Sequence, residues 1–276
     1  MDDLAWRTSA AAAPPLQSAG RTIRAPRTSE NAWSLWLGQL APPALALQDL
    51  LDPAARLVVV APHPDDELLA CGGLMGAHAD RGGRCQVVAV SDGEASHPGS
   101  TRWTPARLRR ARQRERQRGL RALQVRPAPT LRLQFPDGGV GSHADALAER
   151  LAGLLQPGDL VLSTWRRDGH PDHDATGAAC ARACAGVGAC LIEAPVWMWH
   201  WAAPADPRVP WSQLRAFPLS PDLVARKQAA VDCHTSQREA GDGDAGPVLD
   251  AAIVSRVRRT REYLILPTGP ADATPL

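Results

Sequence analysis

The chain has 276 residues, of which 44% are apolar and 22% charged, and its formal net charge is +2. This length supports one large hydrophobic core or two modest ones, and so small a net charge does not indicate binding to nucleic acid. No apolar run approaches the roughly 20 residues that span a bilayer. The N-terminus also lacks the basic and apolar regions of a signal peptide, so we expect a soluble cytoplasmic protein without a membrane span.

The first 30 residues are rich in Ala, Pro, Ser, Thr and Arg and show no clear hydrophobic periodicity. This composition is typical of a flexible arm. Residues 32–51 contain two tryptophans and several leucines, which indicate a helix or a packed extension. We therefore predict an arm over residues 1–30 and a single domain over residues 31–270.

Apolar runs of strand length alternate with longer stretches of helix length between residues 56 and 194. The predicted strands cover residues 56–60, 86–90, 130–135, 159–164 and 190–194. The predicted helices cover residues 67–79, 105–123, 143–155 and 171–185. This alternation predicts a Rossmann-like, three-layer α/β/α fold with a mostly parallel sheet. Ligands of such sheets bind at the C-terminal ends of the strands.

Four of the predicted strands are followed by polar side chains of the kinds that catalyse reactions or bind metals. These side chains are His63, Asp65 and Asp66, then Asp92 and Glu94, then Asp137, and finally Asp168, His170, Asp172 and His173. Because the carboxyl ends of parallel strands meet at one edge of a sheet, we expect these groups to converge.

Two of these clusters have the composition of a catalytic metal site. His63 and Asp66 are three residues apart in one turn and can reach a common point, and His173 would join them from a second strand end. Two imidazoles and one carboxylate leave coordination positions open for water and substrate, as catalytic zinc sites do. A structural zinc site would use four ligands, usually with cysteines, and neither cluster contains a cysteine.

The segment 61–67, with the sequence A-P-H-P-D-D-E, resembles the [AP]-H-P-D-D-E signature of the LmbE/PIG-L family of zinc-dependent N-deacetylases. The segment 170–173, H-P-D-H, resembles the second motif of that family, and the resemblance extends over about residues 56–237. It implies hydrolysis of an N-acetyl amide on a small molecule that contains an amino sugar. Members act on GlcNAc-phosphatidylinositol and on mycothiol and bacillithiol precursors.

The resemblance also implies roles for individual residues. His63, Asp66 and His173 would bind Zn²⁺, with Fe²⁺ as the alternative ion. Asp65 would be the general base, a protonated His170 would stabilise the oxyanion, and Asp172 would orient the site. Spacing alone does not decide whether Asp65 or Asp66 is the ligand.

Further segments are candidates for binding the substrate. Arg112 begins the sequence R-Q-R-E, which resembles an R-x-x-E helix of the family whose arginine faces the substrate. Asp92 lies where sugar hydroxyls would bind, although a plain loop turn explains it equally well. Four tryptophans between Trp197 and Trp211 either line a sugar pocket or form core under a long loop. We expect no nucleic-acid partner, because aromatic residues are not interleaved with the arginines after Trp103.

Two alternatives remain open at this point. His63-Pro64-Asp65 reads as H-x-D and, with His173, could form the iron site of a non-haem Fe(II) oxygenase. That chemistry is usually found on a double-stranded β-helix, and the long predicted helices argue against such a fold. The chain could also be a non-catalytic, sugar-binding member of the same fold.

Overall fold

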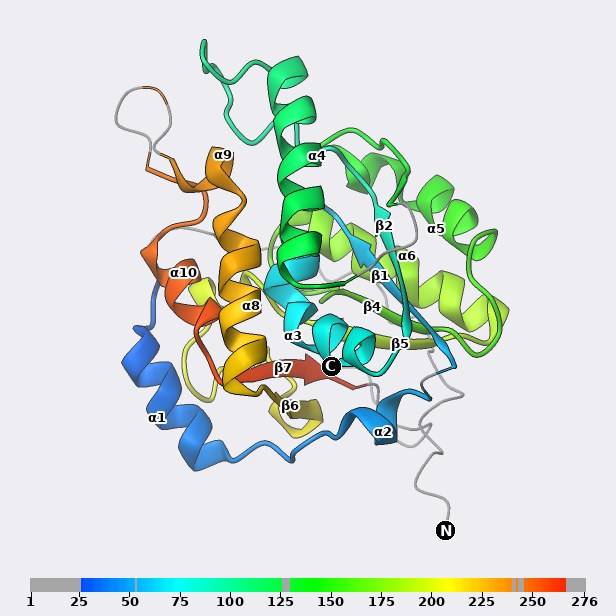
Figure 1. Ribbon diagram of the computed structural model, residues 1–276, viewed down its shortest axis with the longest axis vertical. Coiled ribbons are helices and arrows are strands. Elements are labelled where there is room, and N and C mark those ends of the chain that lie inside the picture. Colours follow the sequence, from blue (N-terminus) through cyan, green and yellow to red (C-terminus); the bar gives the residue numbers. More distant parts are fainter. Residues whose placement is uncertain (1–25, 53, 126–129, 240–241, 243–245, 267–276) are drawn as a thin grey trace.

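The computed structural model describes residues 26–52, 54–125, 130–239, 242 and 246–266. A seven-stranded sheet with the order β3-β2-β1-β4-β5-β7-β6 forms its centre (Figure 1). The strands are β1 (Arg56–Ala61), β2 (Arg84–Ala89), β3 (Leu131–Arg132), β4 (Leu160–Thr164), β5 (Cys190–Ala194), β6 (Leu214–Pro218) and β7 (Arg261–Ile265). Strands β1 to β5 pair in parallel, and β7 pairs antiparallel with both β5 and β6. The predicted, mostly parallel sheet is confirmed.

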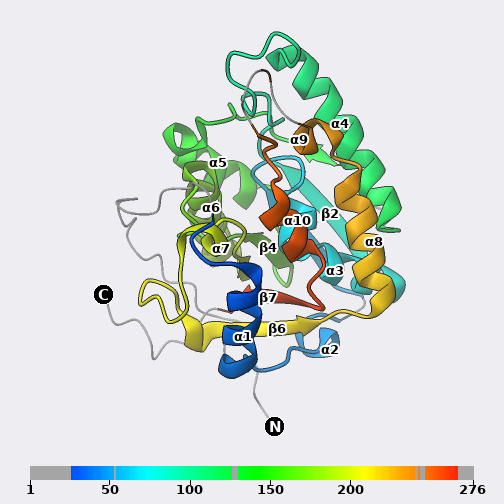
Figure 2. The ribbon, with the colours of Figure 1, turned by 90° about the vertical axis from the view of Figure 1, so that its left-hand side faces the viewer.

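Helices cover both faces of the sheet, which confirms the predicted three layers. The helices are α1 (Glu30–Leu40), α2 (Leu47–Leu50), α3 (Asp66–Asp80), α4 (Pro105–Ala122), α5 (Ala144–Ala152), α6 (Pro171–Val187), α7 (Met198–Trp201), α8 (Pro221–Asp232), α9 (Thr235–Arg238) and α10 (Ala251–Val257), with short 3₁₀ turns η2 (Val140–His143) and η3 (Trp211–Gln213). Figure 2 shows α5 and α6 on one face of the sheet and α3, α4 and α8 on the other. Among the described residues, no helix is both long and apolar enough to cross a bilayer.

The central strand β1 shows why two separate cores form. Successive side chains of a strand point to opposite faces of the sheet. Leu57 and Val59 belong to the core under α3 and α8, whereas Val58 and Val60 belong to the core under α5 and α6. All four are buried. A continuous run of apolar residues is therefore what a strand covered on both faces requires.

The edge of the sheet differs from the prediction at β3. The predicted strand over residues 130–135 is reduced to two paired residues. Gln134 has a φ of 61°, which lies in the left-handed region and interrupts the extended backbone. The strands β6 and β7 were not predicted, because they follow an irregular, Trp-rich segment and pair antiparallel rather than continuing the βα alternation.

The predicted N-terminal arm falls mostly outside the described residues, but its last part is well packed. Thr28 is buried and donates a hydrogen bond from Oγ1 to the carbonyl oxygen of Ala202, and the N–H of Arg27 donates to the carbonyl oxygen of His200. Helix α1 begins at Glu30 and buries Trp33 against Trp199. Arg27 and Thr28 therefore contact the folded part of the chain, and the boundary between the arm and the domain stays a prediction.

The position of α6 depends on a close approach between Gly177 and the backbone that leaves β4. A Cβ at Gly177 would lie 2.6 Å from the carbonyl oxygen of Thr164 and 2.7 Å from the nitrogen of Arg166. Among the described residues, no heavy atom would lie within 4 Å of a Cβ at Gly186, in the same helix. We expect Gly177→Ala to lower the free energy of unfolding by about 2 kcal/mol, and Gly186→Ala to leave it unchanged or raise it by about 0.5–1 kcal/mol. Denaturant unfolding followed by circular dichroism measures both, and equal effects of the two changes would contradict this packing argument.

Candidate metal centre

The first motif forms the turn between β1 and α3. The backbone N–H of His63 donates a hydrogen bond to Oδ2 of Asp66 at 3.0 Å, which closes the turn. Asp65 has a φ of 139°, a value that residues other than glycine rarely adopt. Strained backbone of this kind is concentrated at functional sites. The turn therefore places three polar groups at the C-terminal end of the central strand.

The second motif lies directly beside the first, because β4 pairs with β1. His173 comes from the first turn of α6, which follows β4. The chain places β2 on one side of β1 and, only after β3, returns to place β4 on the other side. The strand order therefore reverses between β1 and β4, and open α/β sheets bind ligands at such a point.

The three predicted ligands meet at this point. Oδ2 of Asp66 lies 3.1 Å from Nδ1 of His63 and 3.2 Å from Nε2 of His173. One ligand atom from each of the three residues lies within 4.8 Å of the other two, and all three residues are buried. The group could thus hold one metal ion, and its role as a ligand set stays a prediction.

The hydrogen bonds of His173 show that the group fits a divalent cation. Its Nδ1 lies 2.9 Å from Oδ2 of Asp168 and donates to it, so Nε2 would carry the free lone pair once the ring is neutral, as a metal ligand must be. That Nε2 is buried and lies 3.2 Å from Oδ2 of Asp66, but it makes no well-formed hydrogen bond among the described residues. Imidazole nitrogens and a carboxylate oxygen are ligands that both Zn²⁺ and Fe²⁺ accept, so the donor set does not choose between them.

The electrostatic field at this point also favours positive charge. Burial lowers the pKa of His173, but the carboxylates of Asp66 and Asp168 oppose it and raise this pKa to about 9. The pKa of Asp66 lies well below its usual range, because attraction to His173 and His63 outweighs burial. The carboxylates thus stabilise cationic partners, and a divalent ion would be stabilised by the same field.

Asp65 has a different environment from Asp66. Its Oδ2 accepts a hydrogen bond from Nη2 of Arg112 at 3.1 Å, and its backbone N–H donates to Oε2 of Glu67 at 3.3 Å. Burial raises the pKa of Asp65 to about 7, although Arg112 opposes this shift. Because only Asp66 lies between the two imidazoles, the geometry favours Asp66 as the ligand and leaves Asp65 beside the site.

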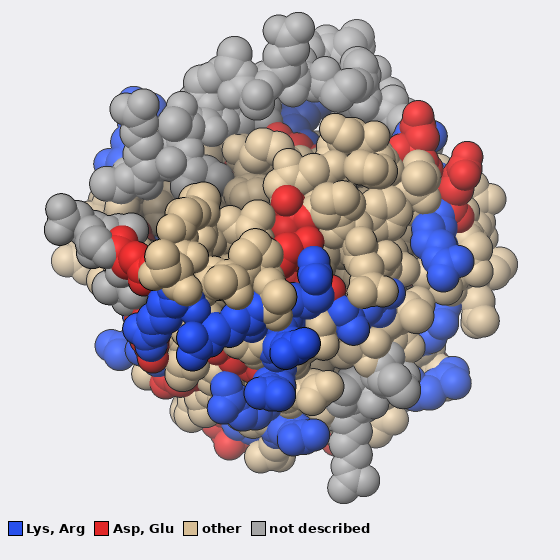
Figure 3. Space-filling model, turned by 90° about the horizontal axis from the view of Figure 1, so that it is seen from above, with Lys and Arg blue, Asp and Glu red and all other residues tan. Residues whose placement is uncertain are grey.

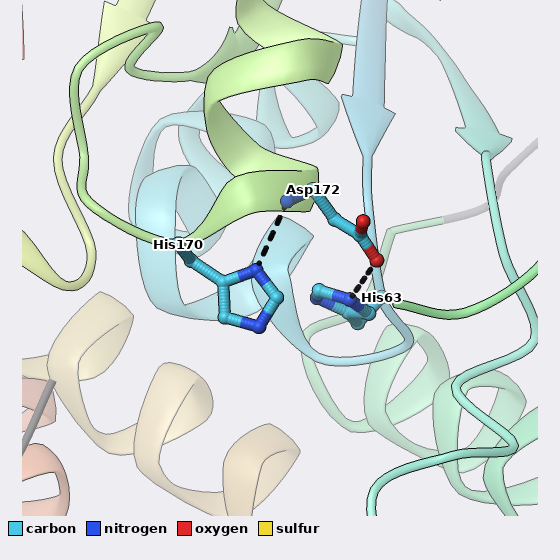
Figure 4. Close-up of side chains that lie close together, drawn as sticks. All are labelled: His63, His170 and Asp172. Carbon is cyan, nitrogen blue, oxygen red and sulfur yellow. Dashed lines mark hydrogen bonds and ion pairs between the residues drawn. The ribbon is translucent and has the colours of Figure 1, made fainter. Parts of the chain in front are cut away.

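His170 and Asp172 lie beside His63 (Figure 4). Oδ2 of Asp172 lies 3.3 Å from Nε2 of His63, and the same carboxylate accepts the N–H groups of Gly138 and Val140. His63, His170 and Asp172 form a second group that could hold a metal ion. The carboxylate of Asp172 is already occupied by these donors, so it is better placed to orient His63 than to bind an ion.

The surroundings of His170 favour a neutral ring, whereas the resemblance implies a protonated one, and its role stays a prediction. Burial lowers its pKa to about 3. Its Nδ1 accepts a hydrogen bond from the backbone N–H of Asp172 at 3.2 Å. The proton of the neutral ring therefore lies on Nε2, from which it can still donate one hydrogen bond.

Two carboxylates contact the site although the sequence did not assign them a role. Asp168 holds His173 and also accepts the backbone N–H groups of residues 196, 197 and 198. Oδ1 of Asp137 lies 3.2 Å from Nε2 of His63. Both residues follow predicted strands, so their position was the signal that could have identified them. Their partners are distant in the sequence, and local spacing could not name those partners.

The structure places the two predicted substrate contacts in existing ion pairs. Arg112 is buried and reaches Asp65 and the carbonyl oxygens of Pro64 and Gly93. Arg132 holds Asp92 with two hydrogen bonds of 2.8 and 2.6 Å. Asp92 is only 2% exposed. Direct contact of Arg112 and Asp92 with substrate stays a prediction, and for Asp92 it would require release from this pair.

Of the tryptophans after β5, some are buried in the core and one lies beside the candidate metal centre. Trp199 and Trp201 are buried in a cluster with Trp33 and Trp165. Trp197 instead stacks on His170, with ring centroids 6.4 Å apart and an interplanar angle of 24°. One tryptophan of this segment therefore borders the candidate metal centre, and the others support the fold.

Residues 58–184 match the model of the PIG-L family, described as GlcNAc-PI de-N-acetylase. The chain contains a PIG-L (LmbE-like) domain. Both motifs, including His63 and His173, lie inside the matched range. No curated protein matches the chain.

Solved structures share the fold of this PIG-L domain. A deacetylase of the teicoplanin biosynthesis pathway has a TM-score of 0.60 at 18% identity, covering 79% of this chain and 100% of that one. The conserved protein TT1542 from Thermus thermophilus has a TM-score of 0.56 at 23% identity, covering 77% and 94%. The N,N'-diacetylchitobiose deacetylase from Pyrococcus horikoshii has a TM-score of 0.50 at 22% identity, covering 76% and 80%. The parallel α/β sheet argues against the iron oxygenase alternative, which is expected on a double-stranded β-helix.

Asp168 offers a test of how the centre is held together. Asp168→Asn keeps the size of the side chain but loses the carboxylate that fixes the ring of His173. Loss of such a partner typically weakens metal binding 10–100-fold, so we expect a weakening of that order without unfolding. Competition with a chelator measures the affinity, and Asp145→Asn, which changes a residue whose side chain is 85% exposed on α5, is the matched control. Metal affinity unchanged in Asp168→Asn would show that the carboxylate does not position this ligand.

Proposed function

We propose that this protein is a metal-dependent hydrolase that removes an N-acetyl group from a substrate containing an amino sugar. The convergence of His63, Asp66 and His173 beside Asp65, inside a PIG-L domain, carries this proposal. The similar folds of a chitobiose deacetylase and a teicoplanin-pathway deacetylase support it.

His63, Asp66 and His173 would hold the ion, with Zn²⁺ as the expected metal and Fe²⁺ as the alternative. A bound divalent cation would supply a Lewis acid, which makes water more acidic and polarises an amide carbonyl. Burial of the three side chains keeps bulk water away and strengthens electrostatic interactions at this point.

Asp65 is the proposed general base. It is buried next to Asp66, and the hydrogen bond from Arg112 fixes the direction of its carboxylate. It would accept a proton from the attacking water as the new C–O bond forms. When the C–N bond breaks, the same proton would pass to the departing amine, so that acetate and the free amino sugar are released. Arg112 and Glu67 act as positioning residues for Asp65 in this scheme.

His170 is the proposed hydrogen-bond donor to the carbonyl oxygen. The backbone N–H of Asp172 occupies its Nδ1, so Nε2–H is available to the oxygen as negative charge develops there. Trp197 stacks on the ring and limits its rotation. A neutral imidazole therefore suffices for this role.

Asp65→Asn and Asp66→Asn should separate catalysis from metal binding. We expect Asp65→Asn to retain the metal and lose about 10²–10⁴-fold in kcat, the usual contribution of acid–base assistance. Asp66→Asn should lose the metal, because the central carboxylate of the group is removed. Elemental analysis of the purified variants and an assay for amine release measure the two effects. Metal loss in Asp65→Asn and retention in Asp66→Asn would reverse the two assignments.

Metal removal provides a second test. Treatment with a chelator should abolish amine release from N-acetylglucosaminyl compounds, and re-addition of Zn²⁺ or Fe²⁺ should restore it. The ion that restores the higher rate of amine release is the one that suits the site better. A metal-loaded protein that binds amino sugars but releases acetate from none of them would contradict the proposal and favour the non-catalytic, sugar-binding alternative.

A further inference from the structure

Helix α4 carries a concentration of positive charge, most of which the proposed catalytic site does not use. Its 18 residues contain eight arginines and a single glutamate, Glu115, which is buried. The whole chain has 31 basic and 29 acidic residues. The rest of the chain is therefore net acidic, and the positive charge is segregated on this helix.

Two buried arginines of α4 are structural. Arg112 pairs with Asp65, and Arg116 donates from Nε to Glu67 at 2.9 Å. Both are 2–3% exposed. These internal ion pairs explain why the two arginines are buried, although Nη2 of Arg116 has no hydrogen-bond partner among the described residues.

Arg109 is half-exposed and pairs with Asp92 and Glu94, but most of the other exposed arginines of α4 have no such explanation. Residues spaced three or four apart share one face of a helix, and the exposed arginines follow this spacing over about four turns. They form the α4 arginine row, which consists of Arg107, Arg110, Arg114, Arg118 and Arg121. No ion pair to the last four occurs among the described residues. Like charges at this spacing repel one another, so the row destabilises the fold.

Figure 3 looks down on the molecule from above the view of Figure 1. Lys and Arg side chains gather in one band on the lower side of this view, where α4 lies at the front of Figure 1. Acidic side chains gather next to this band, nearer the centre of the face. The positive charge on this side of the molecule is therefore visible as a basic band with acidic groups beside it.

A cavity of about 330 Å³ lies between α4 and β3, next to the row. The polar residues that line it are Gln113, Arg116, Gln117, Arg121, Thr130 and Arg132. None of its described lining residues is acidic. Nη2 of Arg116 is buried and makes no hydrogen bond among the described residues. The cavity therefore offers amide, hydroxyl and guanidinium groups, which bind sugar hydroxyls and anionic groups.

The types of side chain on this surface fit some anionic partners better than others. A membrane would favour apolar side chains among the arginines, but the one exposed large hydrophobic residue in the described part of the chain is Leu35, on α1. Single-stranded nucleic acid would favour several aromatic side chains for stacking. Helix α4 has none, and the one aromatic ring at its start, Trp103, is already covered by Arg102 and Arg107. Arginines interspersed with glutamines fit a hydrated sugar chain that carries acidic groups.

We propose that the α4 arginine row and the adjacent cavity bind an anionic glycan, a sugar chain with carboxylate or phosphate groups. This inference rests on the proposed function, because the bound glycan would present its N-acetylated unit to the metal centre. Arg112 on the inner side of α4 touches Asp65, so the row lies only one helix diameter, about 10 Å, from the site. A substrate of several sugar units spans that distance.

The test compares two glycans that share N-acetylglucosamine and differ in charge. Hyaluronan oligosaccharides carry a carboxylate in every disaccharide, whereas chitin oligosaccharides of the same length are neutral. We expect the full-length, metal-loaded protein to bind hyaluronan oligosaccharides at least tenfold more tightly at low salt, and added salt to remove the difference. Titration calorimetry measures binding of both glycans.

Matched variants assign the effect to the helix. Arg110→Gln, Arg114→Gln and Arg118→Gln combined should weaken hyaluronan binding at least tenfold and leave chitin binding unchanged. The control combines Arg81→Gln, Arg150→Gln and Arg258→Gln, which removes three exposed charges outside α4 and should change hyaluronan binding less than twofold. Equal weakening by both sets, or equal affinity of the wild-type protein for the two glycans, would overturn the proposal.

The same measurements also test other anionic partners. They distinguish failure of the anionic-glycan site from failure of the proposed deacetylase function. Tighter binding of duplex DNA or of anionic lipid vesicles than of hyaluronan would overturn the glycan assignment. Acetate release from chitin oligosaccharides without hyaluronan binding would refute the anionic-glycan site and leave the deacetylase proposal intact. Hyaluronan binding through α4 without acetate release from any sugar would support the site and refute the deacetylase proposal.

Discussion

The rest of the candidate site depends on the hydrogen bond and the ion pairs that the carboxylate of Asp66 makes. It closes the β1–α3 turn by accepting the backbone N–H of His63, and it lies between the imidazoles of His63 and His173. A buried carboxylate is costly unless it is paired. One buried carboxylate thus holds together two motifs that lie about a hundred residues apart. Its burial depends on partners from both motifs.

Carboxylates around this centre hold its imidazoles in fixed orientations. Asp168 binds Nδ1 of His173, while Asp137 and Asp172 lie at Nε2 of His63. Each of these carboxylates also accepts backbone N–H groups from a loop that follows a strand. The loops and the imidazoles therefore restrain one another, and a rigid donor set of this kind binds a metal with little loss of its own conformational freedom.

The arginines of helix α4 act both inside the fold and on the surface of the protein. Its inner arginines reach the carboxylates of Asp65 and Glu67, and Glu115 accepts hydrogen bonds from Thr235 and Ser236 at the start of α9. These buried pairs fix the helix beside the first motif. The guanidinium group suits both uses, because it remains charged when buried and presents several donors to anions.

The sequence by itself determined the order of strands and helices from residue 56 to residue 194 and the convergence of His63, Asp66 and His173. Both follow from local rules, since hydrophobic periodicity identifies the elements and the carboxyl ends of parallel strands meet at one edge. Only the tertiary structure decided that Asp66 rather than Asp65 lies between the imidazoles, because neighbouring carboxylates differ in direction but not in spacing. It also decided the partners of Asp168, the antiparallel pairing of β6 and β7, and which arginines of α4 are buried. These features depend on contacts between distant segments, and no local pattern in the chain encodes such contacts.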